Sequence, residues 1–224
     1  MAQDDVFKKQ EADQWFLRNE EYLNNAETVT KDVPLQLVKK NSVAPQRVLE
    51  VGAANGFRLD ELHKRYKSAV TGLELSNKAI AQGKKQFPAI TFVQGSADKL
   101  PFADGAFDMV IINFVLHWVD RKNLLRAVSE LDRVLADKGF LIIGDFYPDT
   151  PGKFPYKHTA GDAVFTYTQQ YQNIFTATHL YSVIDSVYGD HRTKKMGDGA
   201  LPDNRMGFFL LQKNVDIQYQ KRSV

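Results

Sequence analysis

The chain has 224 residues, of which 43% are hydrophobic and 25% charged, and its formal net charge is +2. This length suits one α/β domain with additions, and the small net charge disfavours nucleic acid as the main partner. The absence of cysteine excludes disulfides, thiolate nucleophiles and cysteine-bound zinc. No apolar leader begins the chain and no apolar run approaches ~18 residues, so we expect a cytoplasmic protein without a membrane span.

Residues 1–44 are expected to form a helical extension before the main domain. Apolar residues recur at helical spacing from Asp5 to Asn24. A second helix is predicted from Asp32 to Lys40, with Pro34 in its first turn, where the missing N–H has no cost.

Residues 45–146 alternate between short apolar runs and helix-like segments. The strand-like runs are Arg47–Gly52, Ala69–Leu75, Ile90–Gly95, Phe107–Leu116 and Gly139–Phe146, and the helix-like segments between them are Arg58–Tyr66, Asn77–Gln86 and Arg121–Leu135. This alternation is typical of βαβ units, and it predicts a doubly wound, mostly parallel sheet with helices on both faces.

The pattern changes after residue 146. Residues 147–178 are rich in proline and glycine and are expected to form a loop or insertion on the acceptor side of the site. Residues 179–214 contain two further strand-like stretches, His179–Gly189 and Arg205–Asn214, without room for a crossover helix between them. We expect these stretches to form an antiparallel C-terminal hairpin at the sheet edge, which completes a Rossmann-like α/β sheet of seven strands.

The stretch RVLEVGAANGFRLDEL, Arg47–Leu62, places small residues between a buried strand and a helix. In a doubly wound sheet, such a turn lets a ligand approach the main chain closely. The dinucleotide-binding pattern G-x-G-x-x-G fits poorly from Gly52, because the chain has Ala54 and Phe57 where glycines are required.

An acid-x-Gly-x-small-x-Gly register fits better, with Glu50, Gly52, Ala54 and Gly56. This register resembles motif I of the class I S-adenosylmethionine-dependent methyltransferases, except that Ala54 replaces the middle glycine. A carboxylate near this turn suits a ligand that carries an ammonium and a sulfonium. The turn alone is a weak signal, so the positions downstream decide between the alternatives.

The downstream positions resemble the same family in the same order. Glu74 ends the second strand, where a carboxylate can bind both hydroxyls of a ribose. The stretch VQGSADKLPFADGAFDMVIINFVLHWV resembles the family's adenine-binding segment and fourth strand. The resemblance therefore implies that S-adenosyl-L-methionine binds without a metal, that S-adenosyl-L-homocysteine is the product, and that the cofactor residues are Glu50, Gly52, Ala54, Gly56, Glu74, Leu75, Ala97, Asp98 and Asn113.

Methyl transfer from a sulfonium is an in-line displacement that depends mainly on positioning and desolvation. A hydroxyl acceptor would be helped by a general base, for which the candidates are His117, His158 and Asp145. The candidates for the acceptor pocket or a lid over the ligand are Trp15, Phe16, Trp118, Tyr147 and Tyr156. Each of these aromatic residues could instead only plug a loop or form the apolar face of a helix.

We expect a methyltransferase that acts on an O or N atom of a small molecule, such as a sugar or secondary metabolite, as a monomer or homodimer. Residues Asn113–Leu116 read Asn-Phe-Val-Leu and lack the Asn-Pro-Pro-Tyr motif of base and amide N-methyltransferases. Three alternatives remain open: an NAD-dependent Rossmann oxidoreductase, a non-catalytic cofactor-binding subunit, and an RNA methyltransferase.

Overall fold

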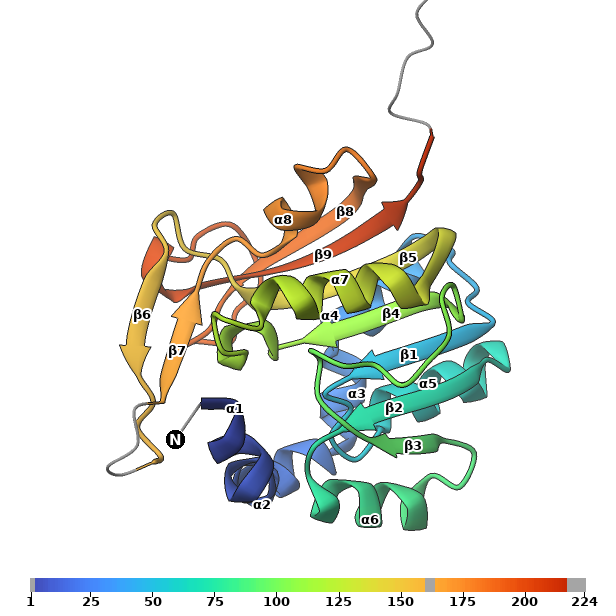
Figure 1. Ribbon diagram of the computed structural model, residues 1–224, viewed down its shortest axis with the longest axis horizontal. Coiled ribbons are helices and arrows are strands. Elements are labelled where there is room, and N and C mark those ends of the chain that lie inside the picture. Colours follow the sequence, from blue (N-terminus) through green and yellow to red (C-terminus); the bar gives the residue numbers. More distant parts are fainter. Residues whose placement is uncertain (1–2, 160–163, 217–224) are drawn as a thin grey trace, which may run out of the picture.

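The computed structural model describes residues 3–159 and 164–216 (Figure 1). Within these ranges the main sheet has seven strands in the order β3-β2-β1-β4-β5-β9-β8. The strands are β1 Arg47–Val51, β2 Ala69–Glu74, β3 Thr91–Gln94, β4 Phe107–Asn113, β5 Leu135–Phe146, β8 Tyr181–Asp190 and β9 Arg205–Lys213. Strands β1 to β5 are parallel, whereas β9 pairs antiparallel with both β5 and β8. The predicted fold class is confirmed, including the antiparallel hairpin at the edge.

Helices cover both faces of the sheet (Figure 1). On one face, α7 (Leu124–Val134) and α8 (Gln172–Thr176) contribute to a core with β1, β4, β5 and β9. On the other face, a second core includes α4 (Val33–Lys40), α5 (Phe57–Tyr66) and α6 (Asn77–Gln86). The central strands are apolar on both sides because both of their faces are buried.

The N-terminal region is more divided than the sequence indicates. The first predicted helix is present as α1 (Gln3–Val6), the π-helical turn η1 (Phe7–Glu11) and α2 (Ala12–Leu23). A short helix that was not predicted, α3 (Ala26–Lys31), follows, and Asn25 caps its N-terminus. Helix α4 begins one residue after the predicted start, because the Asp32 side chain accepts from the Leu35 N–H at 3.0 Å as an N-cap.

Residues 147–178 contain more secondary structure than the expected loop. Strands β6 (Gly152–Pro155) and β7 (Phe165–Thr168) form a separate antiparallel pair, which precedes α8. The Phe-Thr-Tyr-Thr sequence of β7 consists of β-branched and aromatic residues, which favour a strand. In Figure 1 this pair stands beside the sheet, near the N-terminal helices. Two 3₁₀ turns complete the fold, η2 (Leu116–Trp118) and η3 (Pro202–Asn204).

The topology gathers six strand ends at one edge of the sheet. The parallel strands β1, β2, β3, β4 and β5 all end there. Strand β8 is separated from β5 by two antiparallel pairings, so it runs in the same direction as β5 and also ends at this edge. Ligands of open α/β sheets bind outside the carboxyl ends of the strands, so this edge is where a site is expected.

Candidate cofactor and acceptor site

The turn between β1 and α5 has the backbone geometry of a close-approach loop. Gly52, Ala54 and Gly56 have φ angles of +77°, +49° and +87° in the left-handed region. A Cβ atom on Gly52 would lie 2.4 Å from Cγ2 of Val115, and one on Gly56 would lie 2.7 Å from Cδ1 of Ile90. Both glycines are therefore required by conformation and by space, whereas Ala54 adopts a conformation that is costly for a residue with a Cβ.

Glu74 joins this turn to the end of β2. Its carboxylate accepts hydrogen bonds from the backbone N–H groups of Ala54 at 2.8 Å, Leu75 at 2.7 Å and Ser76 at 2.8 Å. Burial raises the pKa of Glu74, and the three backbone donors act in the opposite direction. A carboxylate has about four lone-pair directions, so roughly one remains for a ligand hydroxyl. Leu75 packs against the N-terminal residues Val6 and Phe7.

Glu50 lies in a buried ion cluster. Its carboxylate pairs with Nη1 of Arg58, and Arg58 also binds Asp32 through Nη2 at 2.7 Å. Burial raises the pKa of Glu50 to about 7, Arg58 lowers it, and the Asp32 carboxylate raises it further. The second carboxylate oxygen of Glu50, Oε2, is buried without a hydrogen-bond partner.

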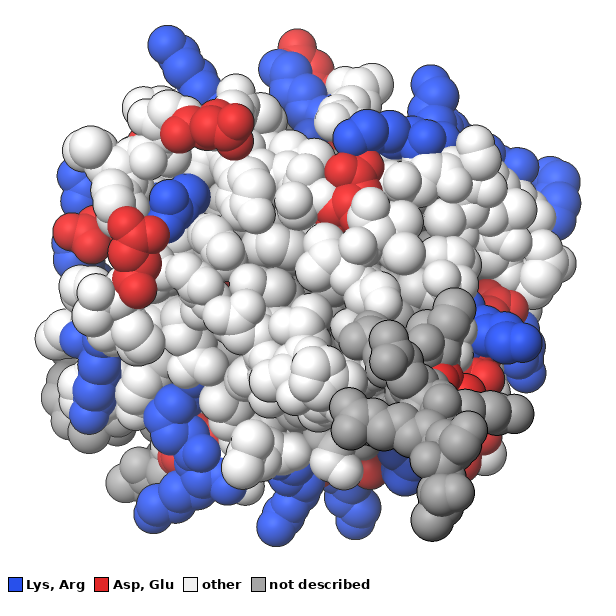
Figure 2. Space-filling model, turned by 90° about the horizontal axis from the view of Figure 1, so that it is seen from above, with Lys and Arg blue, Asp and Glu red and all other residues white. Residues whose placement is uncertain are grey.

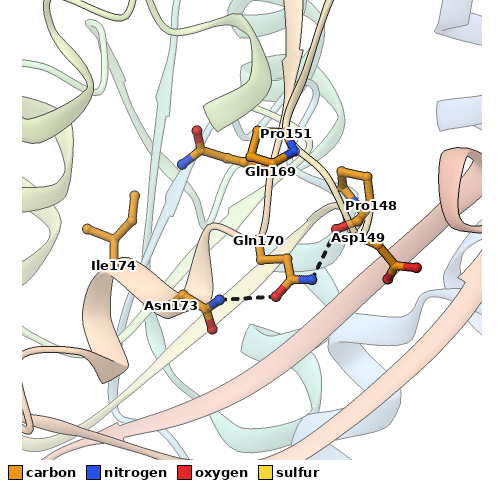
Figure 3. A pocket seen from close by; sticks show the side chains of 7 residues that line it. All are labelled: Pro148, Asp149, Pro151, Gln169, Gln170, Asn173 and Ile174. Carbon is orange, nitrogen blue, oxygen red and sulfur yellow. Dashed lines mark hydrogen bonds between the residues drawn. The ribbon is translucent and has the colours of Figure 1, made fainter.

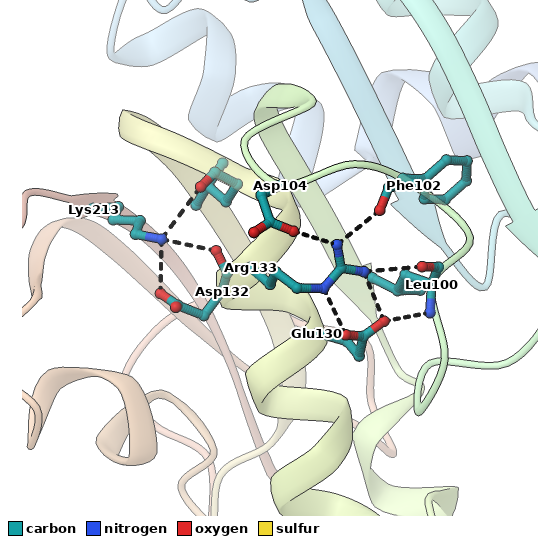
Figure 4. A network of polar contacts seen from close by, with 8 residues as sticks. Leu100, Phe102, Asp104, Glu130, Asp132, Arg133 and Lys213 are labelled. Carbon is teal, nitrogen blue, oxygen red and sulfur yellow. Dashed lines mark hydrogen bonds and ion pairs between the residues drawn. The ribbon is translucent and has the colours of Figure 1, made fainter.

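Asp98 and Ala97 lie in the loop that follows β3. Asp98 accepts a hydrogen bond from Oγ of Ser96 at 2.5 Å, and Ala97 is buried. Arg133 of α7 holds the next part of this loop, because Nη1 donates to the carbonyl of Phe102 at 2.7 Å (Figure 4). The sequence reasoning missed Arg133, although Glu130 and Arg133 have the i, i+3 spacing of a helical ion pair.

Asn113 ends β4 beside Gly144 of β5, its register partner. The Asn113 side-chain oxygen is buried without a hydrogen-bond partner, and a Cβ on Gly144 would lie 2.1 Å from it. The missing side chain at position 144 therefore makes the space that the Asn113 amide occupies.

Unpartnered polar atoms gather at this edge of the sheet. Among the described residues, the buried side-chain atoms without a hydrogen bond include Oε2 of Glu50, Oδ1 of Asn113, Nδ1 of His117 and Nε1 of Trp118. Buried polar groups are normally hydrogen-bonded, so such atoms mark places where a ligand can supply the partner. Two buried acceptors at the ends of β1 and β4 fit an ammonium, and Glu74 fits a ribose. The residues present therefore fit an S-adenosyl ligand.

His117 and Asp145 meet beneath the aromatic side chains. Nδ1 of His117 lies 2.9 Å from Oδ1 of Asp145, but the pair is not aligned as a hydrogen bond. The Asp145 carboxylate also accepts from the backbone N–H groups of His117 at 3.2 Å and Phe146 at 2.8 Å. Both side chains are 3% exposed, so this pair is enclosed by protein.

The structure brings some of the predicted aromatic residues together. The Trp118 ring lies 5.2 Å from Phe7, 6.0 Å from Trp15 and 5.6 Å from Tyr156. The Tyr156 hydroxyl donates to buried Glu11 at 2.7 Å, which ties the N-terminal helices to the segment after β6. These contacts join the N-terminal segment, the end of β4 and residues 147–178 at one edge of the site.

Of the other predicted residues, Phe16 and Tyr147 lie apart from this group, whereas His158 lies at its exposed margin. Phe16 packs against Ala54 at the glycine-rich turn. Tyr147 faces away and packs against Tyr188, with ring centroids 5.2 Å apart. His158 is exposed, and its ring lies 5.3 Å from Tyr156.

His191 was missed by the sequence reasoning. It follows β8 at the site edge, and its ring lies 4.8 Å from Phe146 and 5.9 Å from Phe114. Burial lowers the pKa of His191 to about 4, with a further lowering by Lys194, so the imidazole is neutral at neutral pH. The parallel direction of β8 relative to β5 is the signal that could have found it, because that direction places the next residue beside the ligand loops.

A pocket of about 460 Å³ lies beside β5 and α8 (Figure 3). Pro148, Pro151 and Ile174 line it together with polar residues, namely Asp149, Gln169, Gln170 and Asn173. Gln170 donates to the carbonyl of Pro148 at 3.0 Å. All of the lining residues come from residues 147–178, and the predicted cofactor residues do not line it.

Two features are absent from the described part of the chain, a helix that could span a membrane and a cluster that could hold a metal ion. Across residues 3–159 and 164–216, every helix is too short or too polar to cross a bilayer. In the same part of the chain, histidine, aspartate and glutamate side chains do not form a group of three that could hold a metal ion.

Comparison with known proteins shows that the chain is similar to methyltransferases. Residues 49–143 match the family described as "Methyltransferase domain". The malonyl-[acyl-carrier protein] O-methyltransferase of Legionella pneumophila is 31% identical over 156 residues, which cover 66% of this chain and 51% of that protein. The demethylmenaquinone methyltransferase of Renibacterium salmoninarum is 36% identical over 113 residues, which cover 50% of this chain and 46% of that protein. The chain thus spans about half the length of these curated relatives.

A solved structure agrees with this placement at the level of the fold. The 1,6-didemethyltoxoflavin-N1-methyltransferase of Burkholderia thailandensis, with bound 1,6-didemethyltoxoflavin and S-adenosylhomocysteine, superimposes with a TM-score of 0.71 at 14% identity. The match covers 94% of this chain and 88% of that chain. The matched residues, the relatives and the strand order together show that the chain contains a methyltransferase-like domain and is similar to the class I S-adenosylmethionine-dependent methyltransferases.

Proposed function

We propose that this protein transfers a methyl group from S-adenosyl-L-methionine to an O or N atom of a small molecule. The observation that carries the proposal is the pair of buried, unpartnered acceptors, Glu50 Oε2 and Asn113 Oδ1, beside the glycine-rich turn. When bound, the cofactor supplies an activated methyl group on its sulfonium. The protein then has to hold the two reactants in line and to exclude water.

The residues have distinct roles in this proposal. Glu50 and Asn113 bind the ammonium, Glu74 binds the ribose, and Asp98 with the Ala97 backbone binds the adenine. The turn residues Gly52, Ala54 and Gly56, together with Leu75, let the ligand approach the main chain.

The remaining segments have proposed roles around this core. Residues 1–44 form the lid, 45–146 the cofactor-binding core, 147–178 the acceptor-side insertion and 179–214 the C-terminal hairpin. The contacts of Trp15 with Trp118 and of Glu11 with Tyr156 support a lid that closes over the site edge.

A proton leaves a hydroxyl acceptor during methyl transfer, so a base at the site would help. The enclosed His117–Asp145 pair is one candidate, since the carboxylate can stabilise a protonated imidazole. His191 is another, because its neutral ring has no hydrogen bond within the described residues. Exposed His158 is the weakest of these candidates.

The acceptor is proposed to be a small molecule, such as a sugar or secondary metabolite. The similar proteins named as O-methyltransferase and N1-methyltransferase support an O or N atom as the methylated position. We also propose a cytoplasmic location, which the absence of cysteine supports. A monomer or homodimer is the proposed assembly.

The nucleic-acid alternative is disfavoured by the distribution of charge. On the face drawn in Figure 2, Lys and Arg side chains lie mainly around the margin with Asp and Glu among them, and a broad uncharged area fills the centre. No basic stripe crosses the described part of that face, although a backbone-binding surface is expected to have one.

Ligand binding tests the proposed cofactor. Calorimetry should detect binding of both S-adenosylmethionine and S-adenosylhomocysteine, and each should raise the melting temperature because ligands that bind the folded state stabilise it. NADH should have no effect. If neither S-adenosyl compound binds, the proposal fails, and stabilisation by NADH alone would favour the oxidoreductase. Tight cofactor binding without methyl transfer to any acceptor would favour the non-catalytic subunit.

A further inference from the structure

The proposed ammonium site is tied to the N-terminal helices by a buried ion cluster. Arg58 of α5 lies between Glu50 of β1 and Asp32, the N-cap of α4. Asp32 binds the guanidinium through Nε at 3.0 Å and Nη2 at 2.7 Å, whereas Glu50 is bound through Nη1. The three side chains are at most 7% exposed. Asp32 therefore takes the larger share of the hydrogen bonds that Arg58 offers.

The cluster has more negative than positive charge when both carboxylates are ionised. One guanidinium faces two carboxylates, so one negative charge is left without a cation. Glu74 on the neighbouring strand adds to the negative potential at Glu50. Tyr22 of α2 is exposed and interacts electrostatically with Asp32 and Arg58, and its pKa is raised, so it stays a neutral phenol. A buried, uncompensated charge is costly, and the group binds a proton or a cation instead.

The unpaired oxygen of Glu50 has a suitable neighbour for binding such a cation. Glu50 pairs in register with Ile111, and Asn113 is two residues further along the same strand. Side chains two residues apart point to the same face, so Glu50 and Asn113 share one face on adjacent strands. Both have a buried oxygen without a hydrogen-bond partner. An ammonium has three N–H donors and can satisfy both oxygens at once.

We propose that Asp32 is a positioning residue for the cofactor. It accepts most of the hydrogen bonds of Arg58, so the negative charge of Glu50 remains available for the ligand's ammonium. Glu50 accepts this ammonium in exchange for a proton. This inference rests on the proposed function. In the free protein the carboxyl group of Glu50 retains its proton near neutral pH. When an ammonium-bearing ligand binds, the O–H bond breaks, the proton goes to solvent, and the carboxylate pairs with the ammonium. Charge is conserved in this exchange.

Calorimetry with the full chain tests the exchange. S-adenosylhomocysteine is titrated near pH 7 in two buffers of different ionisation enthalpy, because the difference in heat reports the protons released. Wild type should release about half a proton for each ligand bound. As the pH falls below about 7, the dissociation constant should rise by up to about tenfold for each pH unit. 5′-Methylthioadenosine, which has the adenosine but lacks the amino-acid group, should bind without releasing a proton.

Two variants distinguish positioning from structure. In Asp32→Asn, Arg58 pairs fully with Glu50, which is then ionised before the ligand arrives. Proton release near pH 7 should therefore vanish, and the dissociation constant for S-adenosylhomocysteine should rise about tenfold, with that for 5′-methylthioadenosine unchanged. Asp32→Ser keeps an N-cap without the charge and should behave in the same way if the asparagine variant folds poorly. Asp60→Asn removes an ion pair to Lys64 on the same helix and is the matched control, expected to resemble wild type.

The possible results separate this inference from the proposed function. Binding of S-adenosylhomocysteine by wild type without proton release overturns the exchange. Equal weakening of both ligands by the Asp32 variants would make Asp32 merely structural and would overturn the positioning role. In either case the proposed function stands, whereas wild type that binds neither S-adenosyl compound would overturn the proposed function itself.

Discussion

Two glycines, Gly144 and Gly52, shape this site because neither has a side chain. Gly144 of β5 has its main chain beside the amide of Asn113, and Phe208 of β9 closes the other side. Position 144 therefore requires glycine. The same reasoning applies at Gly52, where a Cβ would meet Val115. Close packing leaves little room for adjustment, because interiors of proteins are as dense as organic crystals.

We expect Gly144→Ala to damage both stability and cofactor binding. The new Cβ would lie 2.1 Å from Oδ1 of Asn113 and 2.7 Å from Cδ1 of Phe208, so both side chains must move. Overpacking of this kind costs roughly 1–3 kcal/mol in the free energy of unfolding, measurable by denaturant titration. Gly199→Ala is the control, because a Cβ there has no atom within 4 Å. A Gly144→Ala variant as stable as the control would contradict the packing around Asn113.

At the scale of elements, the N-terminal helices are attached to the site edge at both ends. Gln3 donates to the carbonyls of Trp118 at 2.7 Å and Phe165 at 2.9 Å. Further along, Asp13 accepts from Oγ of Ser76 at 2.6 Å and from the backbone N–H of Lys78 at 3.1 Å, at the start of α6. These contacts hold α1, η1 and α2 across the carboxyl ends of the strands, which is the position of a lid.

Hydrogen exchange tests the proposed lid. Amide exchange in α1 and α2 should slow when S-adenosylhomocysteine binds, because a ligand beneath the helices stabilises the closed form. Gln3→Ala should speed exchange in the free protein by removing the attachment to Trp118 and Phe165. Helix α8, which packs in the core with β5 and β9, is the internal reference and should not change. Unaltered exchange in α1 and α2 with saturating ligand would argue against a lid.

At the scale of the whole molecule, two buried or half-buried groups give the stability opposite pH dependences. The pKa of Glu50 is raised to about 7 from 4.5, so the folded state holds a proton that the unfolded chain releases, and stability falls as pH rises between these values. The pKa of His191 is lowered to about 4 from 6.5, so its contribution is complete above 6.5 and is lost as pH falls towards 4. In wild type the two trends oppose each other over the shared range.

Two single variants should separate these trends. Glu50→Gln should leave the His191 contribution, so its free energy of unfolding should decrease as pH falls below about 6. His191→Asn should leave the Glu50 contribution, so its free energy of unfolding should decrease as pH rises towards about 7. Denaturant titrations across this range provide the measurement. Parallel pH profiles for the two variants would show that at least one of these groups titrates normally in the folded protein.

Much of the fold was accessible from the sequence because its signals are local. Short apolar runs that alternate with helical segments predict a parallel sheet, and the small residues after β1 mark the turn proposed to bind the ligand. Glu74 and Asp98 could be assigned to the proposed site because Glu74 lies at the end of one predicted strand and Asp98 follows another. The hairpin in residues 147–178 was missed because its two short strands are separated by loop-like sequence, and the π-helical turn leaves no clear signal in the spacing.

The sequence by itself determined the sheet, the turn and the order of the proposed cofactor residues, because these depend on periodicity and on the residue types at strand ends. The tertiary structure alone decided how the charges are paired. Asp32 meets Arg58 across 26 positions of the chain, and His191 reaches Phe114 and Phe146 from the end of the edge strand β8. Whether a carboxylate is free for a ligand depends on the distance, number and burial of its partners, and these are set only when distant segments pack together.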